Sequence, residues 1–138
     1  MGKYVKYLSV FSILLFLSGC SLMPWYHSTT MKINLERVAK DKSHDPVTVI
    51  VMQPVEQKEF VTANYSTVAQ SALNKGTQRY VLLGNQDSES ISMTVEDAPL
   101  AIYFIMKNQP ISNWKYLVES PQGASESFSI SQYEVKKV

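Results

Sequence analysis

Short runs of alternating apolar and polar residues recur from residue 31 to the end of the chain, and this pattern limits the fold more than any other feature. Met31, Ile33 and Leu35 show it first, each followed by a polar residue. Successive side chains of a strand point to opposite faces of a sheet, so alternation predicts a strand with one buried face. Turn residues separate the runs. The pattern predicts seven strands, at 31–38, 47–51, 78–83, 90–95, 100–106, 114–118 and 128–136.

The second run, residues 47–51, consists largely of β-branched residues, and a proline lies on each side of it. A continuous apolar run of this length is typical of a central strand that is buried on both faces. By strand parity Val49 and Val51 share one face, and Ile50 lies on the other, toward the expected helix or the opposite sheet. We therefore predict that truncation of any of the three destabilises the core.

Residues 59–74 change to a period of three to four, with Phe60, Tyr65 and Val68 on one side. This spacing predicts one amphipathic helix, which Asn74-Lys75-Gly76 would end. One helix among seven strands favours a mainly β fold, a β-sandwich, over an alternating βα fold.

The sequence also predicts two strand pairings and one uninterrupted strand. The runs at 78–83 and 90–95 predict a hairpin around a turn at 84–87, and the runs at 100–106 and 114–118 predict partner strands. The last strand is expected to continue without a break, because alternate residues from Phe128 to Lys136 share one parity.

The first nineteen residues have the layout of a secretory signal peptide. Lys3 and Lys6 precede an apolar stretch at 8–17, which is shorter than the roughly 20 residues needed to span a bilayer. The stretch ends in Leu17-Ser18-Gly19-Cys20, which resembles the lipobox of bacterial lipoproteins. Cys20 is therefore expected to become the acylated first residue, and its acyl chains would hold the mature chain on a membrane. The alternative is a plain signal peptide followed by a free or buried cysteine.

Residues 20–30 follow as the acylated cysteine and a tether, and the periplasmic domain is expected at 31–138. Bacterial lipoproteins that are retained at the inner membrane usually carry Asp after the cysteine. This chain has Ser21 there, which favours the outer membrane.

The composition argues against several classes of function. The formal net charge is +1 and the basic residues are scattered, so nucleic-acid binding is not expected. The two histidines, His27 and His44, have no metal-ligand spacing, and the single cysteine excludes a disulfide framework. The sequence has neither a nucleophile elbow nor a phosphate-binding glycine loop. We therefore expect no catalytic residue, no metal and no cofactor, with a hydrolase site assembled across strands as a remote alternative.

The order of these features resembles the outer-membrane lipoprotein of type VI secretion systems, the TssJ family. A lipobox and tether are followed by a first strand, by the run from Pro46 to Pro54, and by a helix. Gln53 matches the glutamine of the family's Tyr-Gln-Leu motif, and Phe60 matches its helix phenylalanine. The resemblance covers residues 47–118.

A further match lies at Trp114-Lys115, where the family has Trp-Arg. Met52 stands in place of the family's tyrosine, and Gly84-Asn85-Gln86 stands in place of its Pro-Gly-Glu turn. The chain is therefore identified as a divergent member.

The resemblance implies an eight-stranded, transthyretin-like sandwich with one added helix, anchored at the periplasmic face of the outer membrane. It also implies a structural role in which several copies join a larger complex and bind the periplasmic part of the inner-membrane protein TssM. The contact in the family involves the loop between the first two strands. In this chain the loop is polar and therefore exposed; its candidate residues are Lys40, Asp41, Lys42, Ser43, His44 and Asp45.

A second hypothesis is a periplasm-facing lipoprotein that binds a small ligand or glycan, or inhibits an enzyme. Such a protein would use exposed aromatic residues, and Tyr103, Trp114 and Tyr116 are the candidates. Sandwich core is the structural alternative for these side chains.

Overall fold

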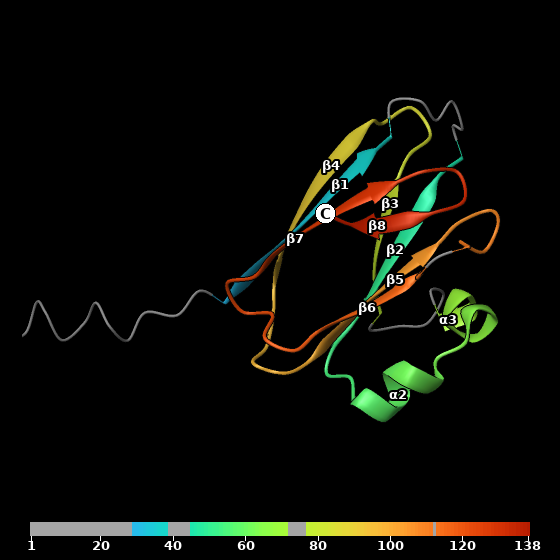
Figure 1. Cartoon of the computed structure of the whole chain (residues 1–138). Helices are drawn as coiled ribbons and strands as arrows, with labels where there is room; N and C mark the ends of the chain where they lie inside the picture. Colours follow the sequence, from blue (N-terminus) through green and yellow to red (C-terminus); the bar gives the residue numbers. More distant parts are fainter. Residues whose placement is uncertain (1–28, 39–44, 72–76, 112) are drawn as a thin grey trace, which may run out of the picture.

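The computed structural model describes residues 29–38, 45–71, 77–111 and 113–138, which form two four-stranded sheets packed face to face (Figure 1). The strand order is β4-β1-β7-β8 in one sheet and β3-β2-β5-β6 in the other. The strands are β1 (Thr30–Arg37), β2 (Val47–Met52), β3 (Gln78–Leu82), β4 (Ser88–Thr94), β5 (Leu100–Ile105), β6 (Lys115–Val118), β7 (Ser125–Ile130) and β8 (Val135–Lys137). The mainly β sandwich expected from the sequence is confirmed.

Most neighbouring strands are antiparallel, and β1 and β7 form the parallel pair. The central position of residues 47–51 is confirmed, since β2 lies between β3 and β5. The pairing expected between 100–106 and 114–118 is also confirmed, because β5 and β6 are antiparallel neighbours.

The space between the two sheets is filled by apolar side chains that alternate along the strands. Val49 and Val51 of β2 point into this inner core, and Phe104 and Phe128 pack edge to face within it at 4.9 Å between ring centroids. Burial of this apolar surface is the main stabilising contribution to a sandwich of this kind.

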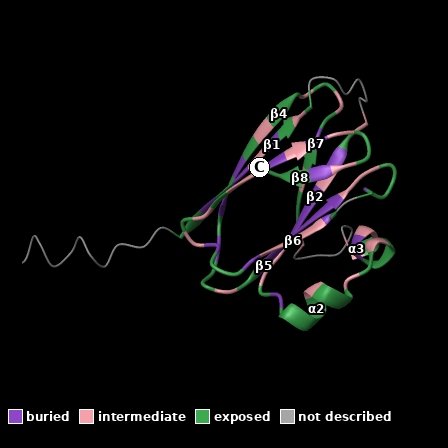
Figure 2. Ribbon diagram, viewed as in Figure 1, coloured by how far each residue is buried: buried purple, intermediate pink, exposed green. Residues whose placement is uncertain are grey.

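The opposite face of the β3-β2-β5-β6 sheet carries a second, smaller cluster under two helices (Figure 1). Ile50 contributes to this outer cluster, as its parity predicted. The helices are α2 (Gln57–Thr62) and α3 (Tyr65–Ser71). No residue of α2 is buried, and Figure 2 shows it exposed along most of its length.

The expectation of one helix over 59–74 is corrected to two short helices in the described part of that segment. Asn64 lies between them, and its side-chain Oδ1 accepts a hydrogen bond of 3.0 Å from the backbone N–H of Thr67. This is the geometry of an N-cap, which starts a new helix at Tyr65. The stop expected at residues 74–76 lies outside the described residues.

The hairpin expected from 78–83 and 90–95 is wrong. β3 pairs with β2 and β4 pairs with β1, so the connection between them crosses from one sheet to the other. Arg37 holds this crossing: its guanidinium donates hydrogen bonds to the carbonyl oxygens of Gln86 and Leu83.

The continuous last strand is also wrong. The chain turns at residues 131–134, where Ser131 N–H donates to the carbonyl oxygen of Glu134 at 2.8 Å, and β8 returns alongside β7. Reversal changes the parity, so Val135 rather than Glu134 or Lys136 is buried opposite Ile130.

Candidate functional site

The two ends of the sandwich hold different segments. One end is marked by Arg37 and holds the connections 38–46, 83–87, 106–114 and 131–134. The strands that these segments connect begin or end there, as their residue pairings show. At the opposite end, marked by Thr30, the first described residues meet the connections 95–99 and 119–124: Val95 N–H donates to Thr29 O, and Gly123 N–H donates to Thr30 O. We call these the Arg37 end and the Thr30 end.

Of the site residues predicted from sequence, Cys20 and Lys40 to His44 lie outside the described residues. Asp45 is described and lies at the Arg37 end, next to the start of β2. Its carbonyl oxygen accepts a hydrogen bond of 2.9 Å from Nη2 of Arg37. The C-terminal stem of the candidate loop is therefore bonded to the same guanidinium that holds the crossing between β3 and β4.

Arg37 is a residue that the sequence interpretation missed. Its Nη2 also lies 3.0 Å from the carbonyl oxygen of Leu83, and its Nε lies 2.8 Å from that of Gln86. One guanidinium on β1 therefore holds together the stem of the candidate loop and the connection between β3 and β4. A single arginine at a strand end gives no distinctive sequence signal, since its partners are backbone carbonyls distant in the chain.

The Arg37 end also gathers exposed apolar side chains. Ile111 is 85% exposed, Leu83 52%, Tyr133 49% and Val38 37%. Ile111 N–H donates to Tyr133 O at 2.8 Å, so two of the loops that carry these side chains are in contact. At the Thr30 end, the described connections 95–99 and 119–124 hold no exposed large apolar residue, although Val61 of α2, in the connection from β2 to β3, is 64% exposed. Exposed apolar residues that gather in one place are a feature of protein interaction surfaces.

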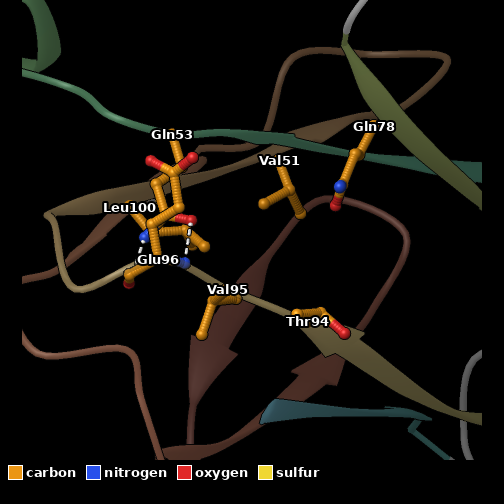
Figure 3. Close-up of a pocket in the computed structure, with 7 residues that line it drawn as sticks. All are labelled: Val51, Gln53, Gln78, Thr94, Val95, Glu96 and Leu100. Atoms are coloured by element: carbon orange, nitrogen blue, oxygen red, sulfur yellow. Dashed lines mark hydrogen bonds between the residues drawn. The ribbon is translucent and has the colours of Figure 1, made fainter. Parts of the chain in front are cut away.

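Gln53, the first residue that matched the family pattern, has a structural role. Its side-chain Nε2 donates to the carbonyl oxygens of Glu96 and Ala98 at 2.8 and 2.7 Å, and its Oε1 accepts from Glu96 N–H at 2.9 Å. Figure 3 shows the side chain reaching across to Glu96 at the edge of a small cavity. This cavity is about 140 Å³ in volume, and Val51, Val95 and Leu100 are among its lining residues.

Lys115 and Phe60, the other matching positions, hold α2 against the sheet. Nζ of Lys115 donates to the carbonyl oxygens of Phe60, Val61 and Ala63 at 2.8, 2.9 and 3.1 Å. The same ammonium lies 5.3 Å from the Phe60 ring centroid and 5.6 Å from that of Trp114, which are cation–π distances. The Trp114-Lys115 pair therefore stabilises the C-terminal end of a helix that buries no residue of its own.

The three aromatic residues of the ligand-binding hypothesis do not form one site. Tyr103 and Trp114 pack together in the outer cluster with ring centroids 5.6 Å apart. Tyr116 packs on the inner core, on the other face of the sheet, and its hydroxyl donates to Val135 O at 2.8 Å. Burial raises the pKa of both Tyr103 and Tyr116, and Glu59 and Glu134 respectively add a smaller rise.

Among the described residues, no three His, Cys, Asp or Glu side chains gather in a way that could hold a metal ion. No described helix has the length and apolar character needed to cross a bilayer.

Comparison with solved structures identifies the class of domain. The type VI secretion lipoprotein TssJ1 from Pseudomonas aeruginosa superposes with a TM-score of 0.56 at 15% identity, over 80% of this chain and 95% of that one. Serratia marcescens Lip, a membrane-bound component of the type VI secretion system, gives 0.62 at 12% identity, over 80% and 97%. A chain from the structure of the TssM C-terminal domain from EAEC gives 0.62 at 12% identity, over 79% and 97%.

These superpositions establish a TssJ-like β-sandwich, which confirms the resemblance seen in the sequence. The family model described as "IglE, N-terminal domain" matches residues 49–131, more than half of the chain. The chain therefore belongs to this family. Comparison with curated protein sequences gave no significant match.

Proposed function

We propose that the chain is a non-catalytic, structural component of a type VI secretion membrane complex, held at the periplasmic face of the outer membrane by an acylated Cys20. It binds the periplasmic part of a TssM-like inner-membrane protein, in several copies within a larger complex. The family match and the fold of the secretion lipoproteins support this assignment.

One observation supports the proposal: the first described residues and the stem of the candidate loop lie at opposite ends of the domain. The described chain begins at the Thr30 end, and β1 then crosses the sandwich to Arg37. Eight residues of strand span about 26 Å. An acyl anchor before Thr30 would attach the chain at the Thr30 end, opposite the end that holds the loop stem and the exposed apolar residues.

Anchoring is tested with Cys20→Ala. The substitution should release the chain from the membrane without changing its Tm, because the side chains of the two described apolar clusters come from Met31 onward. Membrane fractionation and a thermal melt of the same variant measure both effects. A variant that stays with the outer membrane would rule out the acyl chain as the anchor.

Partner binding is tested by replacing Lys40 to Asp45 with a Gly-Ser linker of equal length. Arg37 bonds to the backbone carbonyl at position 45, which the linker retains, so Tm should change little. Capture of the partner's purified periplasmic fragment should weaken, and the weakening should be most evident at low salt, where exposed ion pairs are least screened.

The matched control for this experiment is Glu119→Ser, a loss of one exposed charge at the Thr30 end. This variant should bind the fragment as the unaltered chain does. Unchanged binding by the linker variant would remove the loop from the interface. In that case Ile111→Ser and Tyr133→Ser test whether the apolar residues of the same end carry the contact instead.

A further inference from the structure

A groove of about 380 Å³ lies between the two helices and the outer face of the β3-β2-β5-β6 sheet, and its lining residue Val55 is hydrogen-bonded to Pro99 in a connection of the Thr30 end. Its floor is apolar: Val55 and Val68 are each 5% exposed, and Met52 is half-buried. The groove is distinct from the candidate loop, and none of the family-matching residues lines it.

Tyr103 lines the groove and is 2% exposed, yet its hydroxyl makes no hydrogen bond within the described part of the chain. The contrast with Tyr65, in the same cluster, is direct, since the Tyr65 hydroxyl both donates to Met106 O and accepts from Met106 N–H at 2.8 Å. No fully buried side-chain nitrogen or oxygen of the described chain lacks a partner, so the Tyr103 hydroxyl is open to the groove. A ligand atom can form a hydrogen bond to it there.

Two hydroxyl groups of the groove lining offer oxygen lone pairs, although Asn64 and Thr67, which also line it, carry groups that can donate. Thr62 Oγ1 donates its proton to Lys58 O, and Ser71 Oγ donates to Val68 O, so each hydroxyl oxygen is left as an acceptor. Glu59 is the single charged residue of the lining, and its carboxylate makes no ion pair within the described chain. The nearby ammonium of Lys115 does not line the groove and is already bonded to three carbonyl oxygens.

We propose that this groove binds an arginine or lysine side chain of a partner protein, with the aliphatic stem on Val55 and Val68 and the cationic group between Glu59 and the Tyr103 hydroxyl. The carboxylate of Glu59 and the oxygen lone pair of Tyr103 are complementary to such a side chain, which only donates hydrogen bonds. Its long stem suits an apolar floor, as basic side chains commonly bury their methylene groups. This contact goes beyond the proposed function and lies on a different surface from the candidate loop.

The test uses the full-length chain in detergent micelles, labelled with ¹³C at the tyrosine Cζ position. The chain has eight tyrosines, and Tyr103→Phe identifies the signal of interest by its loss. Three capped tripeptides, Gly-Arg-Gly, Gly-citrulline-Gly and Gly-Leu-Gly, serve as probes. The arginine peptide should shift the Tyr103 signal in a saturable way, and the citrulline peptide, which has a similar shape but no charge, should bind markedly less well.

Glu59→Gln should lower the affinity for the arginine peptide by about threefold to fivefold, which is the effect expected from the loss of one exposed ion pair. The matched control is Glu56→Gln, an exposed acid that lies outside the groove lining and makes no side-chain cap to α2; it should leave the affinity unchanged. Circular dichroism of each variant establishes that it is folded.

Equal binding of the arginine and citrulline peptides, or full affinity in Glu59→Gln, would overturn the proposal. So would a Tyr103 signal that no peptide shifts at tens of millimolar. Preference for the leucine peptide would identify an apolar segment as the occupant and would also overturn it. The measurement contains no secretion partner, so its failure leaves the proposed function to be judged on the linker and Cys20 experiments.

Discussion

The two faces of the β3-β2-β5-β6 sheet are covered in different ways. On the inner face, the other sheet supplies a continuous apolar layer, and no polar or charged side chain is buried in the described chain. On the outer face, two helices of six and seven residues supply one buried side chain between them, Val68. Directed contacts hold those helices in place, chiefly the hydrogen bonds of Lys115 and Tyr65.

This difference shows how a small domain can be rigid on one side of a sheet and adaptable on the other. Burial of apolar area is roughly proportional to the surface removed from water, so the inner face contributes most of the stability. Helices of two turns are marginal by themselves and depend on tertiary contacts. The outer face therefore holds a few replaceable contacts and an open groove, whereas the cavity beside Val51, Val95 and Leu100 of the inner core is smaller, about 140 Å³.

The largest effect is expected from Phe104→Ala in the inner core. Phe104 is fully buried and packs edge to face on both Phe128 and Tyr116. Removing a buried aromatic ring should lower the free energy of unfolding by about 3–5 kcal/mol. Urea unfolding measures this loss, and the exposed Ser92→Ala on β4 should change it by less than about 0.5 kcal/mol. A loss below that of Ile50→Ala would contradict the ranking of the two faces.

Val49→Ala and Ile50→Ala compare the two faces through adjacent residues of one strand. Both side chains are 0% exposed, so each substitution should cost about 2–4 kcal/mol. Ile50→Ala alone should also speed hydrogen exchange in α3, because Ile50 packs in the outer cluster with Val68. If neither substitution lowers Tm, β2 is not a buried strand; if both affect α3 equally, the clusters are not independent.

The burial on both faces of β2 was predictable, because parity within one strand depends only on local sequence. The outcome at Ile50 shows the limit of that argument. Sequence left two environments open for its side chain, under a helix or against the opposite sheet, and only the packing of α2 and α3 decided between them.

Two errors of pairing have a common physical cause. A turn between two strands looks the same in sequence whether the chain stays in one sheet or crosses to another. The crossing from β3 to β4 depends on Arg37, which is more than forty residues away. At the turn between β7 and β8 the chain reverses, so Val135 is buried opposite Ile130. An uninterrupted strand would have placed Glu134 and Lys136 on the buried face instead.

The groove was not predictable either. Glu59 and Thr62 are three residues apart on a helix and could be placed on one side of it from sequence. Tyr103 belongs to a strand whose aromatic residues were expected as core, and it is indeed buried. That its hydroxyl would remain unpaired follows from the arrangement of neighbours in three dimensions, which no local pattern contains.

Lys115→Met tests whether directed contacts, rather than burial, hold the outer helices. The substitution keeps much of the aliphatic length but removes three hydrogen bonds to the end of α2, so we expect a loss of about 1–2 kcal/mol. Faster exchange of the Phe60 and Ala63 amides should accompany it. Lys136→Met, whose ammonium has one exposed ion pair, is the control and should be nearly neutral. An equal loss of stability in Lys115→Met and Lys136→Met would mean that the hydrogen bonds of Lys115 do not hold α2 in place.

Tyr65→Phe should have a smaller effect, about 1 kcal/mol, because one hydroxyl that serves both N–H and C=O of Met106 is removed. The edge-to-face contact of the ring with Trp114 at 5.2 Å is kept. Chemical denaturation gives the value. A neutral result would mean that water replaces the hydroxyl at Met106 without loss.

Tyr103→Phe is expected to have the smallest effect, close to zero near neutral pH, since the hydroxyl that it removes has no partner in the described chain. The unaltered chain and Tyr103→Phe should differ in stability at high pH. Burial, and secondarily Glu59, raises the pKa of Tyr103 above its ordinary value of 10.0, so above that pH the unfolded chain ionises first and the folded chain loses stability. Tyr103→Phe removes this contribution, although that of Tyr116 remains. Urea unfolding of both proteins near pH 7 and above pH 10 should therefore show a shallower fall for the variant. A loss of about 1 kcal/mol near pH 7, equal to that of Tyr65→Phe, would mean that the Tyr103 hydroxyl is already paired and is not free to bind a ligand in the groove.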